Sequence, residues 1–162
     1  MINKIIIISI LVFFCSCKTE VKKQNIKPYL SQSVVQDYAL LFSKPETDSI
    51  SKKIIDYKIS STNQICVYTL DSLPNNAKVL SFATELANKL EVGTKEKNNG
   101  LLILIAKNDR QVAIATGLGS EKTITDSISK IIISNTIIPH FKKNEFYNGI
   151  DNAIDSLISK WN

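Results

Sequence analysis

Apolar residues recur at helical spacing in four stretches of this chain. A Pro and two acids open residues 45–58, where apolar side chains then follow on one face, and residues 79–90 repeat that spacing up to a glycine. Residues 127–138 are rich in Ile, and residues 144–162 carry an apolar stripe that ends in a Trp. The pattern predicts four helices, and Pro139 is expected to end the third.

Short apolar or β-branched runs lie between these stretches and predict strands. Residues 64–70, 101–106 and 111–116 each form such a run, bounded by turn residues. Residues 34–42 are a mixed apolar segment ahead of the first helix. Residues 107–110 are polar and short, which predicts a tight turn between the second and third runs.

The order of these elements predicts the fold class. Helices separate and follow the strands, and the run at 101–106 is apolar throughout, as expected of a strand buried on both faces. A tight turn makes the strands at 101–106 and 111–116 antiparallel neighbours. We therefore expect an α/β fold: a three-layer α/β/α sandwich with a mixed central sheet.

The first sixteen residues differ from the rest of the chain. A short basic start precedes ten residues that are almost all apolar, 5–14, a run too short to span a bilayer but typical of a signal peptide. Cys17 follows the small residue Ser16, whereas Cys15 follows the bulky Phe14. We predict a lipoprotein signal peptide at 1–16 with lipidation of Cys17. The alternatives are an uncleaved anchor and a cytosolic protein with a buried N-terminal strand.

Residues 17–32 are expected to be the lipidated Cys and a basic tether, followed by one domain at 33–162. The stretch 18–27 is polar and basic without apolar periodicity. Lys18, rather than Asp, follows Cys17, which under the enterobacterial sorting rule predicts the outer membrane, facing the periplasm. The expected location is thus the cell envelope, with the lipid on Cys17 as the membrane contact.

Charge and cysteine content narrow the function classes. The 162 residues carry a formal net charge of +5, and the basic residues are scattered lysines with a single arginine. Nucleic-acid binding favours clustered basic residues with aromatics for stacking, so no nucleic-acid partner is expected. With Cys17 lipidated, Cys66 has no disulfide partner, and its apolar neighbours predict a small buried side chain.

Polar residues cluster at the ends of the predicted strands. Arg110 stands out because it is the single Arg of the chain. Its planar guanidinium group can bind a phosphate or a partner's carboxylate. Each motif also has a purely structural interpretation, as a turn or a helix start. The motifs are Asn98-Asn99-Gly100, Asp109-Arg110, Gly117-x-Gly119-x-Glu121 and Thr125-Asp126.

In order and spacing, these motifs resemble the TPM domain family over about residues 33–155. The resemblance also includes Val35-Gln36-Asp37-Tyr38-Ala39-Leu40-Leu41 and Ile138-Pro139 with Phe141, Phe146, Asn148 and Gly149-Ile150. It departs at Asn98, where Asp is common. The resemblance implies an α/β/α domain held at a membrane outside the cytoplasm. It also implies one of three roles: calcium binding, acid phosphatase activity or service as an accessory factor for membrane complexes.

Four oxygen-bearing residues on the predicted loops suggest a metal site. Asp37, Asn99, Glu121 and Asp126 offer carboxylate and amide oxygens without imidazole or thiolate, which favours Ca²⁺, possibly Mg²⁺, over Zn²⁺. Loops at strand ends meet in open α/β sheets, so we expect these four to gather at one end of the sheet.

The leading functional hypothesis is a membrane-anchored, extracytoplasmic Ca²⁺-binding module, monomeric, that assists a protein partner in the envelope. One alternative is a metal-assisted acid phosphatase using Asp37 or Asp126, with Arg110 holding phosphate. Its weakness is that the one histidine, His140, is interpreted as a helix-end residue without a suitable partner nearby in sequence. The other alternative is a purely structural interaction domain.

Overall fold

The computed structural model describes residues 33–74 and 77–161. The predicted signal peptide, the lipidation site Cys17 and the predicted tether lie outside the described residues. Within the described ranges, none of the helices has the length and apolar character needed to cross a membrane.

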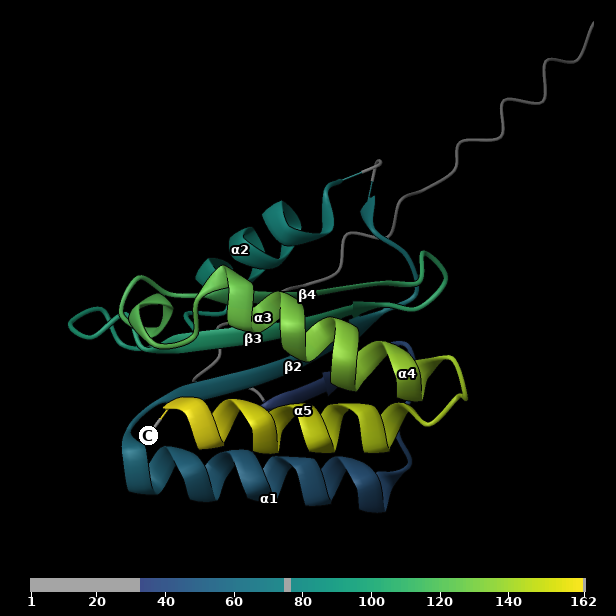
Figure 1. Cartoon of the computed structure of the whole chain (residues 1–162), viewed down its shortest axis with the longest axis horizontal. Coiled ribbons are helices and arrows are strands. Elements are labelled where there is room, and N and C mark those ends of the chain that lie inside the picture. Colours follow the sequence, from purple (N-terminus) through teal and green to yellow (C-terminus); the bar gives the residue numbers. More distant parts are fainter. Residues whose placement is uncertain (1–32, 75–76, 162) are drawn as a thin grey trace, which may run out of the picture.

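Four strands form one sheet in the order β1-β2-β3-β4 (Figure 1). The first three are parallel, and β3 and β4 form an antiparallel pair across a short hairpin. The sheet is therefore mixed, as the tight turn predicted. The strands are β1 (Val35–Asp37), β2 (Gln64–Leu70), β3 (Gly100–Ala106) and β4 (Gln111–Thr116).

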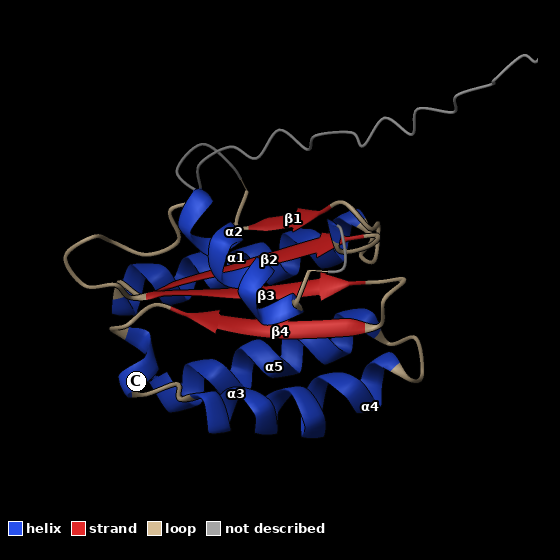
Figure 2. Cartoon of the chain, turned by 90° about the horizontal axis from the view of Figure 1, so that it is seen from above, coloured by secondary structure: helices blue, strands red, loops and turns tan. Residues whose placement is uncertain are grey.

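This topology gives the sheet two ends with different loops. At the carboxyl end, β1, β2 and β3 finish and the β3–β4 hairpin turns. At the amino end, the parallel strands begin and β4 finishes, so the loops at 91–99 and 117–125 meet there (Figure 2).

Helices cover both faces of the sheet and confirm the α/β fold. Helix α2 (Val79–Lys89) lies on one face, where it packs mainly over β3 and β4. Helices α1 (Lys44–Ser61) and α5 (Phe146–Trp161) lie side by side on the other face (Figure 1). The strands β2 and β3, each seven residues long, lie between these helix layers and are buried along their whole length.

The third predicted helix is longer than expected. After a 3₁₀ turn, η3 (Ser120–Lys122), the chain runs through α3 (Asp126–Ile132), the π-helical turn η4 (Ile133–Ile137) and α4 (Ile138–Phe141). This rod packs against α5 and passes beside β4 (Figure 2).

The prediction that Pro139 ends this helix is wrong, because the helix continues to Phe141. The N–H of Ile138 donates to the carbonyl of Ile133, five residues back. Such a widened turn makes room for the proline ring, and Pro139 has no N–H that would need an acceptor.

Candidate functional site

Asp37 lies at the carboxyl end of the sheet and is occupied by hydrogen bonds. Its Oδ1 accepts from the Leu41 backbone N–H at 3.0 Å and from Thr69 Oγ1 at 2.5 Å. Its Oδ2 accepts from the Phe42 backbone N–H at 2.8 Å. The carboxylate therefore closes the turn between β1 and α1.

The same turn presents an apolar side chain to solvent. Ala39 is held on both sides, by a bond from its N–H to Thr69 Oγ1 and one from Lys107 Nζ to its carbonyl. The next residue, Leu40, has φ 51° and is 84% exposed. A left-handed φ is unusual for a bulky residue, so this turn combines backbone strain with exposure.

Arg110 is the last residue of the hairpin at the carboxyl end. It is exposed and adopts φ 53°, and its side chain makes no hydrogen bond or ion pair within the described part of the chain. The neighbouring Asp109 carboxylate instead accepts from the Leu73 N–H at 2.6 Å. The guanidinium is therefore accessible to a ligand from outside the domain.

Asn99 lies at the opposite, amino end and is buried. Its Oδ1 accepts from the Thr94 N–H at 3.0 Å, and its Nδ2 donates to the Thr62 carbonyl at 2.8 Å. Both halves of the amide are engaged, so Asn99 ties the loop before β3 to the end of α1.

Close backbone contact locks the two loops of the amino end together. Gly119 N–H donates to the Asn98 carbonyl at 3.1 Å. A Cβ on Gly119 would lie 1.9 Å from the Lys97 carbonyl oxygen, and one on Gly117 would lie 2.4 Å from that of Asn98. Only glycine permits this approach, which gives the glycine motif of the sequence a structural role.

A cavity of about 270 Å³ opens between these loops and the end of α2. Four of its lining residues carry side-chain oxygens: Asn88, Glu91, Thr94 and Asn98. Lys95 also lines it. Glu91 and Asn98 both adopt positive φ, 54° and 48°. No sequence motif marks Glu91 and Thr94, which follow α2, so linear spacing does not reveal them as site residues.

Glu121 and Asp126 belong to the amino end as well. Glu121 lies in η3, and Asp126 is the first residue of α3, where Thr125 is the N-cap and accepts from the Ile128 N–H at 3.4 Å. Both carboxylates are exposed. Thr125 therefore caps α3, and the Asp126 carboxylate has no capping role.

The expectation that all four predicted ligands gather is wrong for Asp37. Asp37 pairs with Thr69, whereas Gly100, which follows Asn99, pairs with Gln64. Five strand positions separate these levels, about 17 Å along the sheet. Moreover, no three His, Cys, Asp or Glu residues are grouped to hold a metal ion in the described part of the chain.

His140 has a partner five residues away, contrary to the expectation that none lies nearby in sequence. Its Nδ1 lies 2.7 Å from Glu145 Oε2, and its Nε2 lies 3.2 Å from Asn152 Nδ2. The interpretation of His140 as a helix-end residue fits its place in the last turn of α4. The contacts join α4 to the start of α5.

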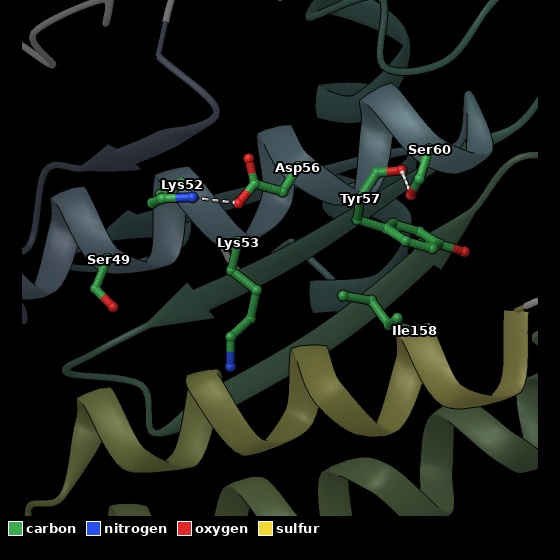
Figure 3. Close-up of a pocket in the computed structure, with 7 residues that line it drawn as sticks. All are labelled: Ser49, Lys52, Lys53, Asp56, Tyr57, Ser60 and Ile158. Atoms are coloured by element: carbon green, nitrogen blue, oxygen red, sulfur yellow. Dashed lines mark hydrogen bonds and ion pairs between the residues drawn. The ribbon is translucent and has the colours of Figure 1, made fainter.

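A second cavity, about 520 Å³, is a groove between α1 and α5 (Figure 3). Lys53 reaches from α1 toward α5, where its Nζ lies 2.6 Å from Asp151 Oδ1 and 2.8 Å from Asp155 Oδ1. Lys52 pairs with Asp56 on the same helix at 2.5 Å. The two ion pairs of Lys53 therefore join the helices, whereas that of Lys52 stays within α1.

Cys66 is buried, as predicted, and is the free cysteine of the described residues. Burial raises the pKa of its thiol to about 12, because the thiolate would lose its hydration. Burial also raises the pKa of the neighbouring Tyr68 phenol. Both groups are therefore neutral at physiological pH.

Comparison with solved structures supports the fold. The N-terminal domain of a protein from P. gingivalis is 28% identical with a TM-score of 0.73, covering 80% of this chain and 82% of that one. The N-terminal domain of cg2496 from Corynebacterium glutamicum is 20% identical with a TM-score of 0.63, covering 84% of each chain. BA42 from Bizionia argentinensis is 21% identical with a TM-score of 0.63, covering 75% of this chain and 86% of its own.

Among curated proteins, no match was found. The sequence profile of the TPM domain, in contrast, matches residues 35–160, which includes every described strand and helix of the domain except the last residue of α5. The resemblance seen in the motifs thus extends over most of the chain, and the chain belongs to the TPM domain family.

Proposed function

We propose that this TPM domain is a lipid-anchored accessory module of the cell envelope that binds Ca²⁺ at the amino end of its sheet. The observation that carries the calcium proposal is the cavity at the amino end, where Asn88, Glu91, Thr94 and Asn98 bring oxygen donors together. Hard divalent cations prefer such ligands, and no imidazole or thiolate lines this cavity.

The lining fits Ca²⁺ in donor type and predicts weak binding. Glu91 is the single carboxylate among the lining residues, and Lys95 brings a positive charge to the same rim. Affinity for Ca²⁺ rises with ligand charge, so we expect a Kd of about 10⁻⁴–10⁻³ M, in the range of extracellular modules. Glu121 and Asp126, two of the ligands that the sequence suggests, lie on adjoining segments at the amino end of the sheet and would add negative charge.

The envelope location rests on the sequence. The apolar run at 5–14, the pair Ser16-Cys17 and the basic stretch that follows support a lipid on Cys17 and a periplasm-facing outer-membrane protein. A protein partner is supported by the carboxyl end, where the strained, exposed Leu40 and the accessible Arg110 guanidinium lie on turns joined through Lys107.

The phosphatase alternative has less support. Arg110 lies at the carboxyl end and Asp126 at the amino end, so these two do not form one site. Asp37 shares an end with Arg110, but three hydrogen bonds already engage its carboxylate.

Calorimetric titration with Ca²⁺ and Mg²⁺ tests the calcium proposal. We expect saturable heat and a rise in melting temperature with Ca²⁺, because a ligand that binds the native state alone stabilises it. Mg²⁺ should act more weakly, since it demands tight octahedral geometry. Glu91→Gln should abolish the effect and Lys95→Ala should strengthen it. The matched control Glu85→Gln, on α2 outside the cavity lining, should bind as the parent does.

Two results would contradict this proposal. One is a melting curve that does not respond to ~10 mM Ca²⁺, well above the expected Kd. The other is hydrolysis of a phosphate ester that Arg110→Ala abolishes, which would favour the phosphatase instead.

A further inference from the structure

The outer side of the α3–η4–α4 rod carries one continuous exposed stripe, here called the rod face. Two rows of exposed residues make up the stripe, each in steps of four: from Lys130 to Lys142 and from Ile131 to Lys143. Residues four apart share one side of a helix, so the two rows lie next to each other. The rod itself lies at the border of the domain (Figure 2).

The rod face is basic and holds no acidic side chain. Two acids flank it: Asp126 forms no ion pair within the described residues, and Glu145 is engaged by His140 at 2.7 Å. On α1, in contrast, the exposed lysines pair with an Asp four residues further on. In the part of the chain that the structure describes, no ion pair is formed by the rod-face lysines Lys130, Lys142 and Lys143.

Two large apolar side chains lie between these lysines. Ile131 is 54% exposed and Ile138 is 38% exposed. A single exposed isoleucine is ordinary on a protein surface. Two of them on one stripe with lysines at both ends give the pattern of helices that lie in a membrane interface.

We propose that the rod face binds the surface of a bilayer that contains anionic phospholipids. The three lysines meet the negative headgroups, and the two isoleucines enter the boundary between headgroups and acyl chains. Lysine suits this partner, because its apolar stem can lie along a greasy surface while the ammonium stays in water. An acidic protein with fixed carboxylates would favour arginine, whose fork binds them in two places, and the rod face has no arginine.

This contact would fix the orientation of the domain. From residue 130 to residue 143 the rod face is about 20 Å long, so it would hold the domain along a line rather than at one point. The contact goes beyond the proposed function, because it needs neither the lipid on Cys17 nor bound Ca²⁺.

A polarity-sensitive dye on the rod face tests the contact. The full chain with Cys15→Ser, Cys17→Ser and Ile138→Cys carries one accessible thiol, since Cys66 is buried. We expect the dye emission to shift to the blue on vesicles that are one third phosphatidylglycerol, but not on pure phosphatidylcholine. Flotation selects the vesicle-bound protein in both samples, and EDTA makes the result independent of the calcium site.

Charge variants identify the groups responsible. Each lysine near an anionic surface strengthens binding about fivefold, so replacing all three rod-face lysines with Gln should weaken the contact ~100-fold and abolish the shift. The matched control loses the same net charge elsewhere and should keep the shift: Lys44→Gln, Lys52→Gln and Lys89→Gln. Salt at ~1 M should also abolish the shift, because the Debye length falls to ~3 Å.

Two further dye positions guard against a local effect of the label. Ser134→Cys keeps both isoleucines of the rod face and should respond as Ile138→Cys does. Leu80→Cys lies on α2, on the other face of the sheet, and is 48% exposed in the parent, so its dye should not respond.

Three results would overturn the lipid contact. The first is equal emission on the two kinds of vesicle, and the second is a shift that survives loss of the three lysines. The third is a dye at Ser134→Cys that responds to polyglutamate but not to anionic vesicles, which would assign the rod face to an acidic protein.

Discussion

Asp37 at the end of β1 accepts a 2.5 Å hydrogen bond from the hydroxyl of Thr69 at the end of β2. The same carboxylate accepts two backbone N–H groups of the following turn. A residue that the sequence proposed as a metal ligand therefore has a structural role that can be measured.

Asp37→Asn should destabilise the domain by about 1–3 kcal/mol, because an amide accepts through one oxygen and leaves donors of the turn unpaired. Urea denaturation measures the difference. Asp71→Asn is the matched control, since Asp71 is an exposed carboxylate just after β2. Equal losses in the two variants would argue against the role of Asp37 in the turn.

Arg110→Gly should stabilise the domain by about 0.5–1 kcal/mol, since glycine adopts the left-handed φ of this position without strain. Arg110→Lys should leave the free energy of unfolding unchanged, because the guanidinium bonds to no described residue. Thermal and urea denaturation test both. A clear loss of stability in Arg110→Lys would instead indicate that the fork makes an intramolecular bond.

Lys53→Met should lower the free energy of unfolding by about 1–2 kcal/mol. This loss lies between the contribution of an exposed ion pair and that of a hydrogen bond to a buried charge. Lys52→Met is the control, because the Lys52 side chain is 77% exposed and its pair with Asp56 should contribute little. A loss in Lys52→Met as large as that in Lys53→Met would contradict the special role of Lys53.

The contribution of Lys53 should also depend on pH. Partial burial disfavours its charge, but the hydrogen bonds and charges of Asp151 and Asp155 outweigh that effect and raise the pKa of Lys53 above 10.5. A raised pKa means that the stabilisation is fully present below 10.5 and is lost as pH rises through the folded-state value. Urea curves at neutral and strongly alkaline pH should therefore show the Lys53→Met difference shrinking. A difference that grew with pH would contradict this sign.

Cys17→Ala should release the protein from the membrane fraction or leave an unprocessed precursor, because no lipid can then be attached. Cell fractionation with intact-mass measurement distinguishes these results. Cys15→Ala is the control and should be processed and anchored as the parent is. A Cys17→Ala protein of normal mature mass that stays with membranes would rule out lipidation at this residue.

Local sequence signals were sufficient to predict most of the helices and strands. The strand bounds 64–70 and 111–116 match β2 and β4 because turn residues flank both runs. Pro139 was misleading because its effect depends on the π turn before it, and such a turn depends on how the rod packs against its neighbours.

The sequence by itself determined the α/β class, the mixed sheet and the polar character of both sheet ends, because periodicity and turn chemistry are local properties. Only the tertiary structure decided which polar residues share an end. Strand register places Asp37 five positions away from Gly100, the residue after Asn99, and the packing of two glycines against the loop before β3 brings Asn98 beside the β4 loop. A site made by register and loop contact has no signature in linear spacing, which is why Glu91 and Thr94 emerged only from the fold.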